Sequence, residues 1–358
     1  MEKKEKKTIL HICDYAALYR GNFIDSLESL ETYHSNIKNI YLFPPRAKNT
    51  EAEKWIAEMN AREEVAYVQE KNFLRKIQQF RKIVRQKKVD FIIRHFSDLR
   101  IDLVIKLFFD SKRVIRFFHG GYKQRSLLKH SLKKFLWKHN KMVGVSDAVA
   151  KEVQQAFPGF SVIAIENAIR FSRLDKIEPI TKPKGISLLM MGWDCRIKGV
   201  DLAIKALWRL QERYDVTLQI VGGMNEGAIR EMVRQIAGGD PEWIRYLPPT
   251  NHIGSYYAVS DIFLSPSRRE AFGYANIEAA YCKNSIVLSK VDGQGELQIE
   301  GAYWFESENT DELINCLEAA ISELGDPEII ARKERVREQV QQKYSLQAWS
   351  KKVAELLE

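Results

Sequence analysis

Residues 265–280 read SPSRREAFGYANIEAA, and they contain a strand end, a loop and a helix start in succession. The apolar run before them, residues 262–264, is typical of a buried strand. Where a strand leads into a helix, the first amides of the helix stay unpaired at the positive end of its dipole. The backbone around Phe272, Gly273 and Tyr274 is therefore expected to bind an anion.

Two carboxylates bracket this loop. Glu270 lies within it, and Glu278 lies about two turns along the helix. A nucleotide sugar presents a diphosphate, a hexose and a ribose in a matching arrangement. Taken alone, the pair also fits a simpler interpretation, a first-turn charge and a solvated helix face, because carboxylates usually lie at the surface.

Short apolar or β-branched runs recur along the whole chain. They lie at residues 8–13, 37–43, 90–95, 114–119, 142–145, 162–165, 186–191, 216–221, 244–247, 262–264, 286–288 and 303–305. Helical patterns, such as residues 200–213 and 226–237, lie between them. Strands that alternate with helices predict βαβ units and mainly parallel sheets, so the expected fold class is α/β.

The pattern breaks once, at residues 169–185, which contain two prolines and several charges. We expect this segment to link an N-terminal domain, residues 1–168, to a C-terminal domain, residues 186–340. Residues 341–358 are predicted to form a terminal helix that crosses back to the first domain. Doubly wound sheets bind ligands at the carboxyl ends of their strands, so the cleft between the two domains is the expected site.

Composition excludes several classes of protein. Of 358 residues, 45% are hydrophobic and 29% are charged, as in a folded globular chain rather than a disordered one. No apolar run approaches the roughly 20 residues that span a bilayer, and the charged start lacks a signal-peptide core, so we expect a cytoplasmic protein. The cysteines are too far apart to predict zinc clusters or disulfides. They are Cys13, Cys195, Cys282 and Cys316.

Charge is divided unequally. Residues 1–170 contain 33 Lys and Arg against 19 Asp and Glu, whereas the remainder has more acidic than basic residues. Residues 122–141 carry seven cations and no acid, interleaved with leucine and aromatic residues, and residues 71–88 add eight cations. The first half therefore favours an acidic or lipid-linked partner. Residues 122–141 fit either a helix lying on anionic lipid or a helix packed on the sheet with its lysines in water.

Further short motifs accompany this loop along the chain. Matching pieces are RGN at 20–22, HGG at 119–121, KGVDLA at 198–203, VGG at 221–223, LP at 247–248 and GE at 295–296. Together with two glutamates that are separated by seven residues after Pro-Ser, they resemble the retaining GT-B glycosyltransferases of family 4, also called glycosyl transferases group 1. The resemblance covers almost the whole chain and implies the GT-B fold, in which two Rossmann-like doubly wound domains face a cleft.

The resemblance also implies roles for individual side chains. Glu278 should bind the ribose hydroxyls, Glu270 a sugar hydroxyl, and Lys198 the diphosphate. These roles are chemically sensible, because carboxylates accept from paired hydroxyls and an ammonium neutralises a departing diphosphate. His119, directly after a strand, is expected to contact the donor sugar near the reacting carbon.

Backbone groups should complete the site, and one position departs from the family. Gly21 and Gly222 lie at turns, where a residue without a side chain exposes its backbone to a ligand. Leu247 lies where backbone groups are expected to select the nucleotide base. The family usually has an arginine five residues before the lysine, where this chain has Trp193. Arg196 is expected to supply the second cation instead.

The sequence thus predicts a retaining glycosyltransferase that moves a sugar from a nucleotide diphosphate donor, UDP first among them, to a hydroxyl acceptor in polysaccharide or glycolipid synthesis. No Asp-x-Asp motif is present, so no metal or other cofactor is predicted. Expected partners are a nucleotide sugar, a glycan or lipid-linked acceptor and an anionic membrane surface, but no nucleic acid. The alternative is a non-catalytic nucleotide-sugar-binding subunit, because of Trp193.

Overall fold

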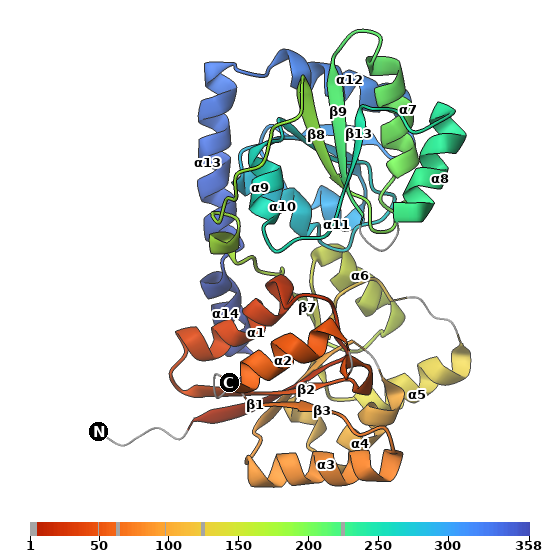
Figure 1. Cartoon of the computed structure of the whole chain (residues 1–358). Helices are drawn as coiled ribbons and strands as arrows, with labels where there is room; N and C mark the ends of the chain where they lie inside the picture. Colours follow the sequence, from red (N-terminus) through yellow and green to blue (C-terminus); the bar gives the residue numbers. More distant parts are fainter. Residues whose placement is uncertain (1–5, 49, 62–64, 97, 123–125, 223–225) are drawn as a thin grey trace. The chain divides into compact units, whose positions relative to one another are not determined.

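The computed structural model describes residues 6–48, 50–61, 65–96, 98–122, 126–222 and 226–358. The chain divides into two compact units. The first comprises Met1–Ile169 together with Leu346–Glu358, and the second comprises Arg170–Ser345. Each unit is built around its own parallel sheet, which confirms the predicted α/β architecture (Figure 1).

The first unit has a seven-stranded parallel sheet in the order β3-β2-β1-β4-β5-β6-β7. The strands are β1 (Lys7–Cys13), β2 (Ile37–Phe43), β3 (Val65–Val68), β4 (Phe91–His95), β5 (Val114–Phe118), β6 (Lys141–Gly144) and β7 (Val162–Ala164). The strand order reverses between β1 and β4, which pair with Ile12 beside Arg94. A crevice is expected at the carboxyl ends of these strands, because the flanking connections leave in opposite directions.

Helices cover both faces of this sheet. They are α1 (Gly21–Tyr33), α2 (Glu51–Ala61), α3 (Phe73–Gln86), α4 (Leu99–Phe108), α5 (Leu127–Trp137), α6 (Asp147–Ala156) and α14 (Leu346–Glu355). Successive residues of a strand point to opposite faces. Ile92 of β4 accordingly packs with Phe80 of α3 and Ile101 of α4, while His95 meets the ring of Phe23 of α1 edge-on, 5.0 Å between centroids.

A buried charge cluster ties β4 and β5 to α4 and α5. Asp102 is 2% exposed and accepts hydrogen bonds from Arg94 (3.1 Å), Arg116 (2.8 Å) and Trp137 (2.9 Å). Burial alone would raise the pKa of the Asp102 carboxyl, but the guanidiniums of Arg116 and Arg94 outweigh burial and hold the pKa below its usual value. The carboxylate of Asp102 is therefore the shared counter-ion of two buried guanidiniums.

The second unit has a six-stranded parallel sheet in the order β10-β9-β8-β11-β12-β13. The strands are β8 (Ile186–Met191), β9 (Val216–Val221), β10 (Ile244–Leu247), β11 (Ile262–Ser265), β12 (Ser285–Lys290) and β13 (Tyr303–Glu306). The helices are α7 (Val200–Leu210), α8 (Glu226–Ala237), α9 (Ile253–Ala258), α10 (Tyr274–Tyr281), α11 (Asp292–Gly295), α12 (Thr310–Ser322) and α13 (Pro327–Lys343). Again the order reverses, between β8 and β11.

Two segments differ from the sequence-based expectation. Of residues 169–185, expected to be a linker, all but Ile169 fall in the second unit, where Phe171 and Leu174 are buried. A Cβ on Gly254 would lie 2.1 Å from the Leu174 carbonyl oxygen, so this segment packs tightly. The expected terminal helix is two helices, since α13 continues to Lys343 and α14 begins at Leu346, in the first unit. No helix among the described residues is long and apolar enough to cross a membrane.

The substitution Asp102→Asn tests the buried cluster. It leaves two buried guanidiniums without a counter-charge, so we expect a loss of about 3–5 kcal/mol of stability. The lowered midpoint would be measured by urea unfolding with tryptophan fluorescence. Glu51→Gln, which breaks an exposed ion pair with Lys54, is the control and should cost less than about 1 kcal/mol. Equal midpoints for the two variants would contradict the prediction.

Candidate functional site

Two loops meet at the carboxyl ends of β8 and β11, the adjacent central strands of the second sheet. The backbone amide of Arg268 donates to the Ile197 carbonyl at 2.7 Å, and the Arg268 guanidinium donates to the Arg196 carbonyl at 2.6 Å. Gly199 has a φ of +67°, and a Cβ there would lie 1.9 Å from the Pro266 carbonyl oxygen. The loops can approach this closely because residue 199 is glycine.

A bidentate ion pair holds the two loops together. Arg268 donates through both terminal nitrogens to Asp201, in the first turn of α7, at 2.7 and 2.9 Å. The same guanidinium also contacts Glu308 at 3.0 Å. Planar two-point contacts of this kind fix orientation as well as distance. Arg268 and Asp201 were not predicted as site residues, although both lie inside motifs that were recognised in the sequence.

Lys198 and Glu270 come together at this junction. The Lys198 ammonium lies 2.6 Å from Oε2 of Glu270, and the two side chains are 12% and 17% exposed. The ammonium also lies over the Trp193 ring, 5.1 Å from its centroid. The structure thus places two predicted site residues, 72 positions apart in sequence, in direct contact at a solvent-accessible point.

The helix that follows Glu270 has an unusual start. Gly273 caps α10 with a φ of +89°, and no side chain caps the helix. A Cβ at Gly273 would lie 2.6 Å from Nδ2 of Asn276. The first amides of α10 therefore have no side-chain acceptor from the cap residue, as an anion site requires. Phe272 is 3% exposed and packs against Tyr274 and Tyr344, so its side chain belongs to the core.

Glu278 is held at both carboxylate oxygens. It forms an ion pair with Arg173 and accepts a hydrogen bond from the Tyr257 hydroxyl at 3.2 Å. Burial, reinforced by the Glu278 carboxylate, raises the pKa of Tyr257 well above its usual value, so the phenol stays a neutral donor. Neither partner was predicted from the sequence. Arg173 lies in the segment expected to be a linker, and no motif singled out Tyr257.

Two other predicted residues are neighbours at the same sheet edge. The amide of Gly222, just after β9, donates to the carbonyl of Leu247 at the end of β10 at 3.3 Å. Gly222 also faces Ile229, whose Cδ1 would lie 2.3 Å from a Cβ at that position. The third residue of the predicted VGG motif, Gly223, lies outside the described residues.

His119 and Gly21 lie in the first unit, at the carboxyl edge of its sheet. The Nε2 atom of His119 lies 3.1 Å from Nδ1 of His95, and Phe23 packs edge-on against the His119 ring at 5.2 Å. Burial lowers the pKa of His119 to about 4, so the imidazole is neutral at pH 7. Gly21 begins α1 with a φ of +60°, two residues before Phe23. The structure thus brings these two predicted residues to one region.

Arg196 is exposed, and no contact joins its side chain to Lys198 or Glu270 among the residues that the structure describes. Together with Arg268, which has the larger effect, it lowers the pKa of Glu308. Trp193 is 58% exposed, beside Lys198. In the described part of the chain, no three or more His, Cys, Asp and Glu side chains form a group that could hold a metal ion.

Comparisons with known proteins show what the chain is similar to. Residues 173–340 match the family model for glycosyl transferases group 1. The D-inositol 3-phosphate glycosyltransferase of Jonesia denitrificans is 30% identical over 120 residues, which cover 31% of this chain and 28% of that protein. Matches to curated relatives span only about a quarter to a half of the relatives' length, 28% and 52% for the first two.

Solved structures match over nearly the whole chain. A glycosyltransferase from Rickettsia africae has a TM-score of 0.81 at 19% identity, covering 98% of both chains. The Anabaena protein HepE, solved with UDP and glucose, has a TM-score of 0.75 at 16% identity and covers 98% of this chain and 99% of its own. At these identities the likeness concerns the fold, which is GT-B. Residues 173–340 of this chain are therefore similar to the glycosyl transferases group 1 family.

Proposed function

We propose that the protein is a retaining glycosyltransferase that moves a sugar from a UDP-sugar to a hydroxyl acceptor in polysaccharide or glycolipid synthesis. The observation that carries the proposal is the contact between Lys198 and Glu270 beside the uncapped start of α10. An ammonium group and a carboxylate beside a helix start without a side-chain cap support the binding of a diphosphate and a sugar hydroxyl. HepE, a structural neighbour, was solved with UDP and glucose.

The donor would lie across this junction. Its diphosphate meets the first amides of α10 and the Lys198 ammonium, while Glu270 accepts from a sugar hydroxyl. Lys198 is paired with Glu270 before the donor arrives, so it can turn towards the diphosphate as negative charge develops there. Glu278, oriented by Arg173 and Tyr257, binds the ribose hydroxyls.

In the proposed reaction the bond between the anomeric carbon and the diphosphate oxygen breaks, and its electron pair leaves with the diphosphate. The acceptor hydroxyl oxygen bonds to that carbon on the same face. Its proton passes to the departing phosphate, so no carboxylate attacks the sugar. The His119 imidazole, neutral at pH 7, is available as an uncharged hydrogen-bond partner for a sugar. Catalysis then rests on positioning and on charge stabilisation by Lys198, and we propose that no divalent ion is needed.

Glu278→Gln tests the donor site. The amide keeps the shape of the side chain but loses its charge, and we expect the Kd for UDP-glucose to rise about tenfold or more, measured by calorimetry on the full chain. Glu338→Gln, an exposed position on α13, should bind like the wild type. An unchanged Kd in Glu278→Gln, with an unchanged melting temperature, would remove Glu278 from the site.

Lys198→Met tests the role of the cation in turnover. Loss of the ammonium should lower the rate of UDP release from UDP-glucose by about 10²–10³, because charge on the departing diphosphate is no longer stabilised. Lys205→Met, an exposed position on α7, is the control. If the wild type binds UDP-glucose but releases no UDP with any acceptor, the non-catalytic subunit replaces the enzyme as the explanation.

We also propose that the first unit works at an anionic membrane surface. Residues 122–141 contain α5, whose Leu136 and Trp137 are buried. Its outer side, however, exposes Leu127 (76%), Leu128 (82%) and Phe135 (63%) among lysines. A helix that only packs on its sheet would bury such residues, whereas an interfacial helix presents them to lipid. The segment's first two cations, at positions 123 and 125, lie outside the described residues.

Replacing Leu127 and Leu128 together by serine removes two leucines from this surface. We expect co-sedimentation with vesicles that contain phosphatidylglycerol to weaken about tenfold or more, because burial of each leucine contributes on the order of 1.5–3 kcal/mol. Ile330→Ser, on α13, removes an apolar side chain that is 51% exposed and serves as the control. Equal co-sedimentation of both variants would argue against a membrane role for α5.

A further inference from the structure

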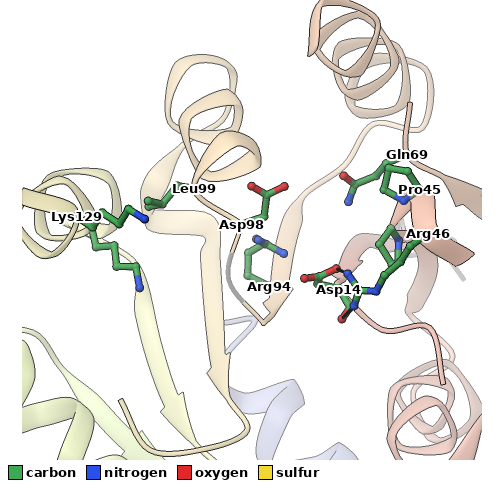
Figure 2. A pocket seen from close by; sticks show the side chains of 10 residues that line it. Asp14, Pro45, Arg46, Gln69, Arg94, Asp98, Leu99 and Lys129 are labelled. Atoms are coloured by element: carbon green, nitrogen blue, oxygen red, sulfur yellow. Dashed lines mark hydrogen bonds and ion pairs between the residues drawn. The ribbon is translucent and has the colours of Figure 1, made fainter. Parts of the chain in front are cut away.

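The first unit contains a cavity of about 730 Å³ that the proposed donor site does not use. It lies where the carboxyl ends of β1 to β4 meet the starts of α4 and α5, so it occupies the crevice at which the strand order reverses. Figure 2 shows Arg94 at its centre, with Lys129 on one side and Arg46 on the other. The charged side chains that line it are Arg46, Arg94, Lys129, Lys133, Asp14 and Asp98.

The two carboxylates of the cavity already have partners. Asp14 pairs with Arg46 at 2.5 Å, and Arg46 also donates to the Asp14 carbonyl at 2.9 Å. Asp98 caps α4 by accepting from the amide of Arg100 at 2.9 Å, and it lies 3.6 Å from the ammonium of Lys76. The lining therefore has four cations against two occupied carboxylates, an excess of positive charge.

Arg94 has hydrogen-bonding capacity left over. It is 1% exposed, and its Nε and Nη1 atoms donate to Asp102 (3.1 Å) and to the Ile12 carbonyl (3.2 Å). Its Nη2 atom is buried and has no hydrogen-bond partner among the described residues. Asp102 also accepts a hydrogen bond from Arg116, so two guanidiniums share one carboxylate and the buried cluster has a net positive charge. Such a charge is costly unless an anion meets it.

Lys129 and Lys133 bring further charge to the same wall. They are four residues apart on α5, so their side chains lie on the same face of the helix. Burial lowers the pKa of Lys133; the Asp102 carboxylate opposes this effect, while the cations of Arg116 and Lys129 add to it. These ammonium groups repel one another, and a bound dianion would relieve that repulsion.

We propose that this cavity binds a phosphomonoester group of the acceptor. A phosphomonoester carries close to two negative charges at pH 7, which matches the excess of cations, and its three terminal oxygens can accept from the cations that line the cavity. A carboxylate offers one charge and two oxygens. The acceptor role rests on the proposed function, but the anion site itself does not.

The test uses the full chain, with inorganic phosphate as the probe. Calorimetry at constant ionic strength measures the Kd for phosphate. The double variant Lys129→Gln/Lys133→Gln should raise the Kd for phosphate about tenfold or more. The matched control, Lys134→Gln/Lys138→Gln, removes the same charge from α5 and its C-cap residue, outside the cavity, and should bind like the wild type. A second cavity variant, Arg46→Gln, should also weaken binding.

Further probes identify the source of the phosphate. Cavity-dependent binding of glycerol 3-phosphate points to a soluble acceptor. Cavity-dependent binding to phosphatidylcholine vesicles with phosphatidic acid, but not with phosphatidylglycerol, points to a lipid headgroup. Either result supports the proposal. No phosphate binding, or equal binding by cavity and control variants, overturns it.

Binding of UDP-glucose by the wild type, measured alongside, separates the two proposals. If UDP-glucose binds but phosphate binding does not depend on the cavity, only the acceptor site is lost. If phosphate binds in the cavity but UDP-glucose does not bind, the donor assignment fails and the anion site stands.

Discussion

The bidentate contact between Arg268 and Asp201 is the interaction on which the candidate site depends. It joins the loop before α10 to the first turn of α7, with the close approach of Gly199 to Pro266 beneath it. Lys198 and Glu270 each lie two to three residues from one of these contacts, so their meeting at 2.6 Å follows from the way the two loops are held. A site built in this way is preorganised before any ligand binds.

Charge is handled differently in the two units. In the second unit the site cations already have acidic partners, as Lys198, Arg173 and Arg268 each do. In the first unit Arg94 and Arg116 share one buried carboxylate, and positive charge remains in excess. The first arrangement suits a site where charge develops and departs during a reaction. The second suits a site that holds an anion of fixed charge.

Much of the fold could be predicted because its signals are local. Alternating apolar runs and helical patterns predicted the strands of both sheets except β3, a four-residue strand at a sheet edge. The predicted linker, residues 169–185, packs in part on the second unit. Prolines and charges in residues 170–185 suggested an exposed connection, whereas Phe171 and Leu174 anchor part of this segment in the second unit's core.

The sequence alone determined the α/β class and the loop that leads from Glu270 to Glu278, because periodicity and turn residues act over a few positions. Tertiary structure decided which side chains meet there. Arg173 is 105 residues from Glu278, and Asp201 is 67 residues from Arg268. Arg94 reaches its cavity only because β4 lies beside β1. Such contacts depend on strand order, which brings together residues that are far apart in the chain. Local sequence patterns do not encode that order.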